Sequence, residues 1–265
     1  MTGRKTMILD IDGTLVRGNS SLDINLVARI NSARTLGWLI ILATGRRLVD
    51  IVGIRALLKP HFTLTSEGST ISNETDILRQ FTLPRNTIST VIENGARYGL
   101  TPILCCEDRA YVYEWSPAVD RAIAMGVSKP HIIANTFTPE MVTLVLLVTA
   151  NVGLLPIGLP EQVIDSCEAS SSVSAPGMIS VNLPSVNKGS AFDWVLEHVV
   201  GVERSEIFVL AAGNSDNDAT LAARSDFFIA MADGTPGIRA AANVIAPTIE
   251  NGGIVEILGN IMLKY

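Results

Sequence analysis

The stretch that decides the fold is MILDIDGTL, residues 7–15. Its opening apolar run is short and ends in polar residues and a glycine, which is typical of a buried parallel strand followed by a loop. Asp10 and Asp12 therefore stand at the carboxyl end of the predicted strand. In open α/β sheets, ligands bind at this edge.

The residues after this strand continue an alternating pattern. Apolar residues recur at helical spacing from Leu22 to Ala33, and the run from Trp38 to Ala43 predicts a second strand. The predicted elements that follow are a helix near 48–58, a strand at 62–65, a helix near 190–200, a strand at 207–212, a helix from about 218, and strands at 227–231 and 243–246. Such alternation indicates a parallel sheet with helices on both faces.

The middle of the chain has a different pattern. A predicted helix near 87–98 is followed by β-rich runs at 101–106 and 110–115, and a second pair at 171–175 and 178–183 surrounds Pro176 and Gly177. Both pairs read as antiparallel hairpins. We therefore expect an α/β protein whose core domain comprises residues 1–82 and 185–265, with an inserted α+β domain at 83–184.

The composition excludes some classes of partner. The formal net charge of the 265 residues is -6 and no cluster of Lys and Arg stands out, so we expect no nucleic-acid partner. The first seven residues lack the architecture of a cleavable signal, and the three cysteines lack metal-ligand spacing. We therefore expect reduced thiols and a cytoplasmic protein.

One apolar stretch, Met141 to Leu159, has no charged residue and is about long enough to cross a bilayer. Asn151, Gly153, Pro156 and Gly158 would break a helix in its second half. We therefore expect a buried strand followed by a loop, and no membrane segment.

Polar residues also follow other predicted strands. Thr44 and Gly45 come directly after the second strand, where a hydroxyl and the amides of a helix N-terminus can bind a phosphate. Taken alone, the pair favours an ordinary helix cap over a phosphate site. Lys188 lies where the chain returns to the core domain and could neutralise a phosphate, although a lone lysine before a helix is usually a surface residue.

The acidic loop GNSDND, residues 213–218, follows the strand at 207–212. Such a turn means little by itself. Together with Asp10, Asp12, Thr44 and Lys188, it completes a set of nucleophile, metal ligands, hydroxyl anchor and cation that phosphoryl transfer requires. Paired carboxylates in this place suit Mg²⁺, which prefers oxygen ligands.

Four motifs stand in a fixed order along the chain: Asp10-x-Asp12-Gly-Thr, Thr44-Gly-Arg, Asn187-Lys188-Gly, and Gly213-x-x-x-Asn217-Asp218. In these motifs the sequence resembles the haloacid dehalogenase superfamily, specifically the subclass IIB or Cof-like phosphatases. The resemblance covers both ends of the chain, and the insert lies where that subclass carries its α/β cap. It implies a Rossmann-like core and a cap domain that governs substrate specificity.

The resemblance also implies roles for residues. Asp10 would be the nucleophile, Asp12 the general acid and then base, and Lys188 a catalytic cation. The residues expected to bind phosphate are Asp10, Thr44, Gly45, Lys188 and Asn217. These roles imply a Mg²⁺-dependent phosphatase that hydrolyses a small phosphomonoester, such as a sugar phosphate, through an aspartyl-phosphate intermediate.

The expected metal site departs from the family pattern. The resemblance implies that Mg²⁺ is held by the Asp10 carboxylate, the Asp12 carbonyl and an acid directly after the glycine of the last loop. In this sequence the position of that acid is occupied by Asn214. A charged metal ligand is therefore lost unless Asp218 or Asp216 compensates. A neutral oxygen can still bind Mg²⁺. We therefore expect Asn214 and Asp218 to complete the site. The loop TSEG, residues 65–68, also departs from the usual Glu-Asn-Gly.

Two other functions are compatible with these motifs. The subclass includes phosphomutases, which product analysis would distinguish from phosphatases. A non-catalytic phosphate-binding regulator is suggested by Asn214, but Asp12 is positioned to activate water, and a simple receiver does not need a large insert. Arg109, Tyr111, Tyr113 and Trp115 alternate along a predicted strand and are candidates for contact with the leaving group, although for any one of them ordinary packing in the cap sheet is the favoured interpretation.

Overall fold

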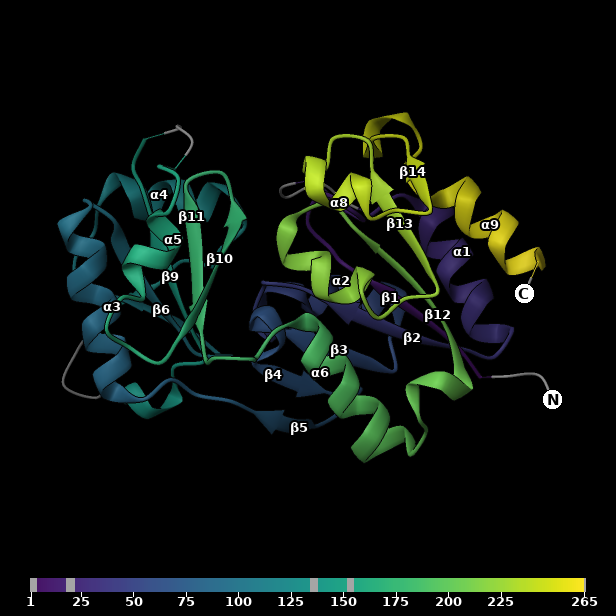
Figure 1. Ribbon diagram of the computed structural model, residues 1–265, viewed down its shortest axis with the longest axis horizontal. Helices are drawn as coiled ribbons and strands as arrows, with labels where there is room; N and C mark the ends of the chain where they lie inside the picture. Colours follow the sequence, from purple (N-terminus) through teal and green to yellow (C-terminus); the bar gives the residue numbers. More distant parts are fainter. Residues whose placement is uncertain (1–3, 18–21, 134–137, 152–154, 265) are drawn as a thin grey trace.

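The computed structural model describes residues 4–17, 22–133, 138–151 and 155–264, and these form two sheets with their own helices (Figure 1). The first sheet has the strand order β14-β13-β12-β1-β2-β3-β4-β5. Its parallel strands are β1 (Arg4–Leu9), β2 (Trp38–Ala43), β3 (Phe62–Thr65), β12 (Ile207–Gly213), β13 (Phe227–Met231) and β14 (Val244–Ala246). An antiparallel pair, β4 (Thr70–Ser72) and β5 (Ile77–Gln80), closes one edge.

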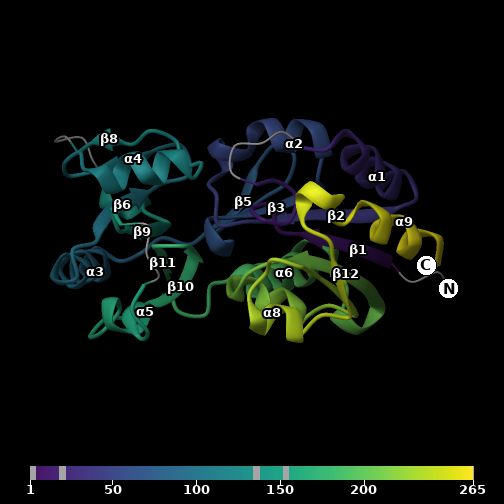
Figure 2. The same cartoon turned by 90° about the horizontal axis from the view of Figure 1, so that it is seen from above.

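Helices cover both faces of this sheet, as Figure 2 shows. Side chains alternate along β1, so Met7 and Leu9 pack in one core while Ile8 packs in the other. The first face carries α1 (Ile24–Thr35), α2 (Val52–Leu58) and α9 (Val255–Lys264). The second carries α6 (Lys188–Val195), α7 (Ala219–Ala222) and α8 (Pro236–Ala240). The predicted α/β core is confirmed.

The second sheet lies in the inserted domain and has the order β10-β11-β9-β6-β7-β8. Its strands are β6 (Thr101–Cys105), β7 (Ala110–Val112), β8 (His131–Ile132), β9 (Leu144–Val148), β10 (Ser170–Ala175) and β11 (Met178–Asn182). Helices α3 (Arg85–Arg97) and α5 (Leu159–Val163) pack on one face and α4 (Pro117–Ala124) on the other. Both predicted hairpins, β6 with β7 and β10 with β11, are antiparallel.

Short helical turns connect these elements: η1 (Leu48–Ile51), η2 (Ser66–Gly68), η3 (Pro139–Met141), the π-helical η4 (Leu196–Val200), η5 (Arg204–Glu206), η6 (Asp216–Asp218) and η7 (Ile249–Asn251). The helix predicted near 48–58 is observed as η1 followed by α2, so Thr44 and Gly45 precede its start and do not open it. The strand predicted to reach residue 115 ends at Val112. Helix α9 was not predicted.

The apolar stretch from 141 to 159 contains the fully buried strand β9, as expected, and Gly153 lies outside the described residues. Within the described ranges, we find no helix with the length and apolar character needed to cross a membrane.

Candidate active site

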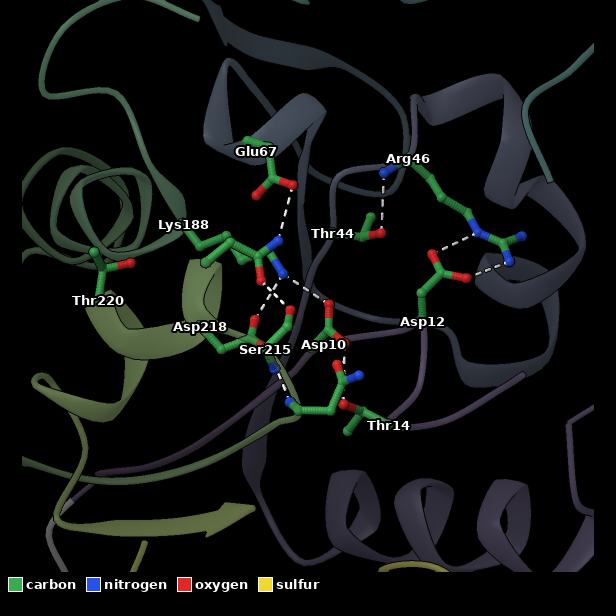
Figure 3. Close-up of polar contacts among 12 residues, drawn as sticks. Asp10, Asp12, Thr14, Thr44, Arg46, Glu67, Lys188, Ser215, Asp218 and Thr220 are labelled. Atoms are coloured by element: carbon green, nitrogen blue, oxygen red, sulfur yellow. Dashed lines mark hydrogen bonds and ion pairs between the residues drawn. The ribbon is translucent and has the colours of Figure 1, made fainter. Parts of the chain in front are cut away.

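Lys188 is the centre of a buried ion cluster where two parallel strands end (Figure 3). Its Nζ donates to Asp10 Oδ1 and to Asp218 Oδ1, each at 2.7 Å. Burial alone would lower the pKa of the Lys188 ammonium, but the charges of Asp10 and Asp218 outweigh it and raise the pKa well above its ordinary value. Lys188 is therefore a permanent buried cation.

The position of Lys188 is fixed by the start of α6. Asn187 caps this helix, since its side chain accepts the backbone N–H of Ser190 at 2.9 Å, and the Ser190 hydroxyl accepts the N–H of Asn187 at 3.0 Å. Lys188 is the first residue of the helix. The capped start of α6 therefore holds the Lys188 ammonium in a fixed, buried position, whereas a lone lysine before a helix usually lies on the surface.

Asp10 directly follows β1, and its backbone N–H continues the strand pairing by donating to Ala212 at 3.1 Å. Its Oδ2 accepts the Thr14 hydroxyl at 3.0 Å. Burial first, and then the charge of Asp218, raise the pKa of Asp10 to about 8, although Lys188 lowers it. A nearby cation favours the ionised carboxylate that a nucleophile must be.

Asp12 faces a different cation. Arg46 Nε and Nη2 donate to both of its carboxylate oxygens, at 2.8 and 2.6 Å. The Asp12 side chain is 42% exposed, whereas that of Asp10 is 5% exposed. A bidentate pair fixes the plane of the carboxylate as well as its position. Asp12 is therefore an accessible, oriented carboxylate beside the buried one.

Thr44 and Gly45 lie in a turn between β2 and η1. Thr44 is fully buried and its Oγ1 accepts the backbone N–H of Arg46 at 3.1 Å, so it does not cap a helix. Figure 3 shows Thr44 between the Asp10–Lys188 pair and Arg46. A Cβ at Gly45 would lie 2.5 Å from Glu67 Oε1, so only glycine allows Glu67 to approach so closely.

Glu67 is a buried carboxylate to which the sequence analysis gave no role. It follows β3 with a positive φ of 57°, directly after Ser66 at 50°. Such consecutive left-handed non-glycine residues are uncommon and cluster at functional sites. Burial raises the pKa of Glu67, against the charge of Lys188. Its Oε1 accepts Asn217 Nδ2 at 2.9 Å, so the expected phosphate ligand Asn217 is engaged in holding Glu67.

Asp218 anchors the last loop. One of its oxygens accepts Lys188, and the other accepts the backbone N–H groups of Asn214 and Ser215, at 2.9 and 3.1 Å. Both oxygens are thus engaged by the protein, and the side chain is fully buried. In this arrangement Asp218 positions Lys188 and the loop, and its expected role as a metal ligand stays a prediction.

Asn214 reaches between the two aspartates of the first motif. The structure places the amide oxygen toward these acceptors; with the amide turned so that its nitrogen faces them, it donates to the Asp12 carbonyl oxygen at 2.8 Å and to Asp10 Oδ2 at 3.3 Å. No group of three or more His, Cys, Asp or Glu residues suited to a metal ion occurs in the described part of the chain. The donors available to a hard cation are Asp10 Oδ2, the Asp12 carbonyl and, with the amide oxygen facing inward, Asn214 Oδ1. Such a set fits Mg²⁺, which needs only one or two carboxylates alongside waters and a substrate phosphate.

Comparison with known proteins agrees with this geometry. The family model of haloacid dehalogenase-like hydrolases matches residues 7–258. The chain belongs to this family. Among solved structures, a haloacid dehalogenase-like hydrolase from Bacteroides thetaiotaomicron is 20% identical, with a TM-score of 0.80, 97% of this chain covered and 99% of the other. The subclass IIB sugar phosphatase BT4131 is 17% identical, with a TM-score of 0.82 and coverage of 97% and 98%.

A curated relative matches over a shorter length. It is a phosphoglycolate phosphatase from Methanothermobacter thermautotrophicus, 33% identical over 79 residues. This segment covers 30% of the present chain and 34% of the relative. The solved structures therefore support the fold of this hydrolase along its whole length, a Rossmann-like core with an inserted cap.

The cap of this hydrolase contacts the core through Glu107, at the turn between β6 and β7. Glu107 Oε2 accepts the backbone N–H of Leu48 at 2.8 Å and the Thr65 hydroxyl at 3.1 Å, and Oε1 accepts the Ser66 hydroxyl at 2.5 Å. The carboxylate is buried. The sequence predicts only a turn at Glu107, because the partners of its side chain lie 41 to 59 residues away.

The four cap residues considered for the leaving group do not share one strand. Tyr111 lies on β7 and packs against His131 with 6.1 Å between ring centroids, while Tyr113 and Trp115 lie beyond the end of the strand. Trp115 Nε1 donates to Asp120 at 2.9 Å and Arg109 pairs with Asp108. These contacts are local to the cap.

Proposed function

We propose that the protein is a Mg²⁺-dependent phosphatase that hydrolyses small phosphomonoesters through an aspartyl-phosphate formed on Asp10. The observation that carries the proposal is the cluster of Asp10, Lys188 and Asp218 at the end of β1, with the accessible carboxylate of Asp12 two residues further on. A buried nucleophile beside a fixed cation and an exposed acid–base group is the arrangement that covalent phosphoryl transfer needs.

In the first step, an ionised Asp10 oxygen attacks phosphorus and Asp12 protonates the departing alcohol. Lys188 offsets the negative charge of the phosphoryl group, and Thr44 offers a hydroxyl to one of its oxygens. In the second step, Asp12 takes a proton from water, which attacks the phosphoryl group and regenerates Asp10. Arg46 orients Asp12 for both steps. Mg²⁺, held by Asp10, the Asp12 carbonyl and Asn214, would supply positive charge that offsets the charge of the phosphoryl group.

The position of the cap favours a small molecule as the substrate. Glu107 ties the β6–β7 turn to Leu48, Thr65 and Ser66, which lie near the ends of β2 and β3, so the cap is closed against the core on the side of the site. A closed cap limits the size of the leaving group and excludes water. One relative is a phosphoglycolate phosphatase and one structural neighbour is a sugar phosphatase, which supports a small phosphorylated metabolite as the substrate.

The decisive experiment measures phosphate release from an aryl phosphate and a panel of sugar phosphates, with Mg²⁺ or with chelator. We expect release that requires Mg²⁺ and is abolished by Asp10→Asn. Asp23→Asn is the matched control, because Asp23 caps α1 and asparagine caps equally well. Isomerisation of a sugar phosphate without release would instead identify a mutase, and neither activity in folded wild type would favour a phosphate-binding regulator.

A further inference from the structure

The backbone of Asn214 is fixed by two hydrogen bonds, and its side chain points over Gly13 toward the first motif. Its backbone N–H donates to Asp218 Oδ2 at 2.9 Å, and its carbonyl accepts the N–H of Thr235 at 2.9 Å. The side chain lies on Gly13, where a Cβ would come within 2.8 Å of Asn214 Cγ, closer than real contacts allow. Gly13 therefore makes the space through which the amide reaches the first motif.

Asn214 can complete the hydrogen bonds of Asp10 when its amide nitrogen, rather than its amide oxygen, faces the first motif. The carboxylate accepts Lys188 at 2.7 Å on one oxygen, and Thr14 at 3.0 Å and Asn214 at 3.3 Å on the other. The same nitrogen donates to the Asp12 carbonyl at 2.8 Å. An aspartate in this place would instead bring an oxygen within these distances of two other oxygens, with no hydrogen to share. Such a cluster would need a cation, whereas the asparagine cluster is satisfied without one.

We propose that Asn214 makes magnesium a co-ligand of the phosphorylated substrate rather than a resident of the free protein. The amide nitrogen holds Asp10 and Asp12 together in the metal-free protein, and the amide turns its oxygen inward when Mg²⁺ enters with a phosphate. The inference rests on the proposed function, because it concerns the metal of that reaction.

Charge supports this order of binding. The three oxygens that can face the cation carry one formal negative charge, that of Asp10, and Lys188 offsets it from 2.7 Å. Asp12 directs its carboxylate to Arg46 and Asp218 directs its own to Lys188. The free site therefore attracts a divalent cation weakly, and a phosphate dianion supplies the missing charge.

The test is calorimetric titration of Mg²⁺ into the full chain, with and without saturating inorganic phosphate, corrected for the magnesium phosphate complex in solution. We expect binding to wild type to be at least about tenfold tighter with phosphate, within the usual range of coupling between two ligands. Equal affinity with and without phosphate would overturn the inference.

The variant Asn214→Asp sharpens the result. We expect it to bind Mg²⁺ without phosphate at least about tenfold more tightly than wild type, and its metal-free form to melt at a lower temperature. Asn260→Asp makes the same charge change at an exposed position of α9, and its Mg²⁺ affinity should equal that of wild type. Should Asn214→Asp fail to fold, the two wild-type titrations decide alone.

These titrations need no turnover. Coupled binding of Mg²⁺ and phosphate without phosphate release would overturn the proposed function and leave this inference standing. Phosphate release by a protein whose Mg²⁺ affinity is the same with and without phosphate would support the proposed function and overturn this inference.

Discussion

Glu107 provides the most specific prediction, because a single cap side chain accepts three hydrogen bonds from the core. Each hydrogen bond to a charged group contributes about 1.5–3 kcal/mol net, and bonds that share one group are less than additive. For Glu107→Ala we therefore expect the closed cap to lose about 4 kcal/mol. At about 1.4 kcal/mol for each factor of ten, this lowers the closed population relative to the open one on the order of a thousandfold.

The matched variant is Glu107→Gln. Its amide oxygen can still accept Leu48 and Thr65, and the Ser66 hydroxyl can turn to accept from the amide nitrogen. Only the contribution of the charge is lost, so we expect a loss of about 1–2 kcal/mol, well below that of alanine.

Hydrogen exchange at the Leu48 amide measures this contact directly. Leu48 is the first residue of η1, so its N–H has no partner within that turn and donates to Glu107 instead. We expect its protection to fall strongly in Glu107→Ala, weakly in Glu107→Gln, and to be unchanged in both variants at Met7 to Leu9 of β1. Unchanged Leu48 protection in a folded Glu107→Ala protein would refute the reasoning.

Three further predictions concern the site and the thiols. Arg46→Lys keeps the positive charge, but lysine cannot donate to both oxygens of Asp12 in the bidentate geometry of arginine. We expect kcat to fall about 10- to 100-fold in steady-state assays. An unchanged kcat would show that Arg46 does not orient Asp12 for the reaction. Asp10→Asn should raise the melting temperature of the metal-free protein, and more at pH 8 than at pH 5. The pKa of Asp10 is raised to about 8 in the folded protein from 3.8 in the unfolded chain. The free energy of unfolding of wild type therefore decreases as the pH rises from 3.8 toward 8, whereas the asparagine variant does not titrate and loses no stability in this way. A gain that shrinks toward pH 8 would contradict this. Burial raises the pKa of Cys105 to about 12 and of Cys106 to about 11. Neither thiol should therefore react with iodoacetamide at pH 8 in the time that alkylates the denatured protein. Rapid labelling of either thiol in the native protein would show that it is not buried.

The regular elements were predicted best where an apolar run ends sharply. Strand β2 was predicted with its observed ends, because Gly37 and Thr44 bound the apolar run from Trp38 to Ala43. Helix α9 was missed. The helix near 48–58 was predicted, but Thr44 and Gly45 do not stand at its N-terminus, because they lie in a turn held by a hydrogen bond that a pattern of apolar residues does not reveal.

Sequence motifs indicated which residues gather at the site but not how they are paired. Lys188, Asp10 and Asp218 come together across 178 and 30 residues of chain, as the shared edge of the parallel sheet requires. The pairing of Arg46 with Asp12 and the burial of Glu67 depend on side-chain packing between loops, which local spacing does not encode. Asp218 illustrates the difference, since its place was expected but its engagement by Lys188 and two backbone amides was not.

Covalent catalysis by Asp10 can be tested by mass spectrometry of acid-quenched Asp12→Asn protein incubated with Mg²⁺ and an aryl phosphate. An aryl leaving group departs without a general acid, whereas hydrolysis of the intermediate needs Asp12 to activate water. We expect a burst of phenol and one phosphoryl group on the peptide that contains Asp10. A burst without modification of that peptide, or a phosphoryl group on another residue, would contradict it.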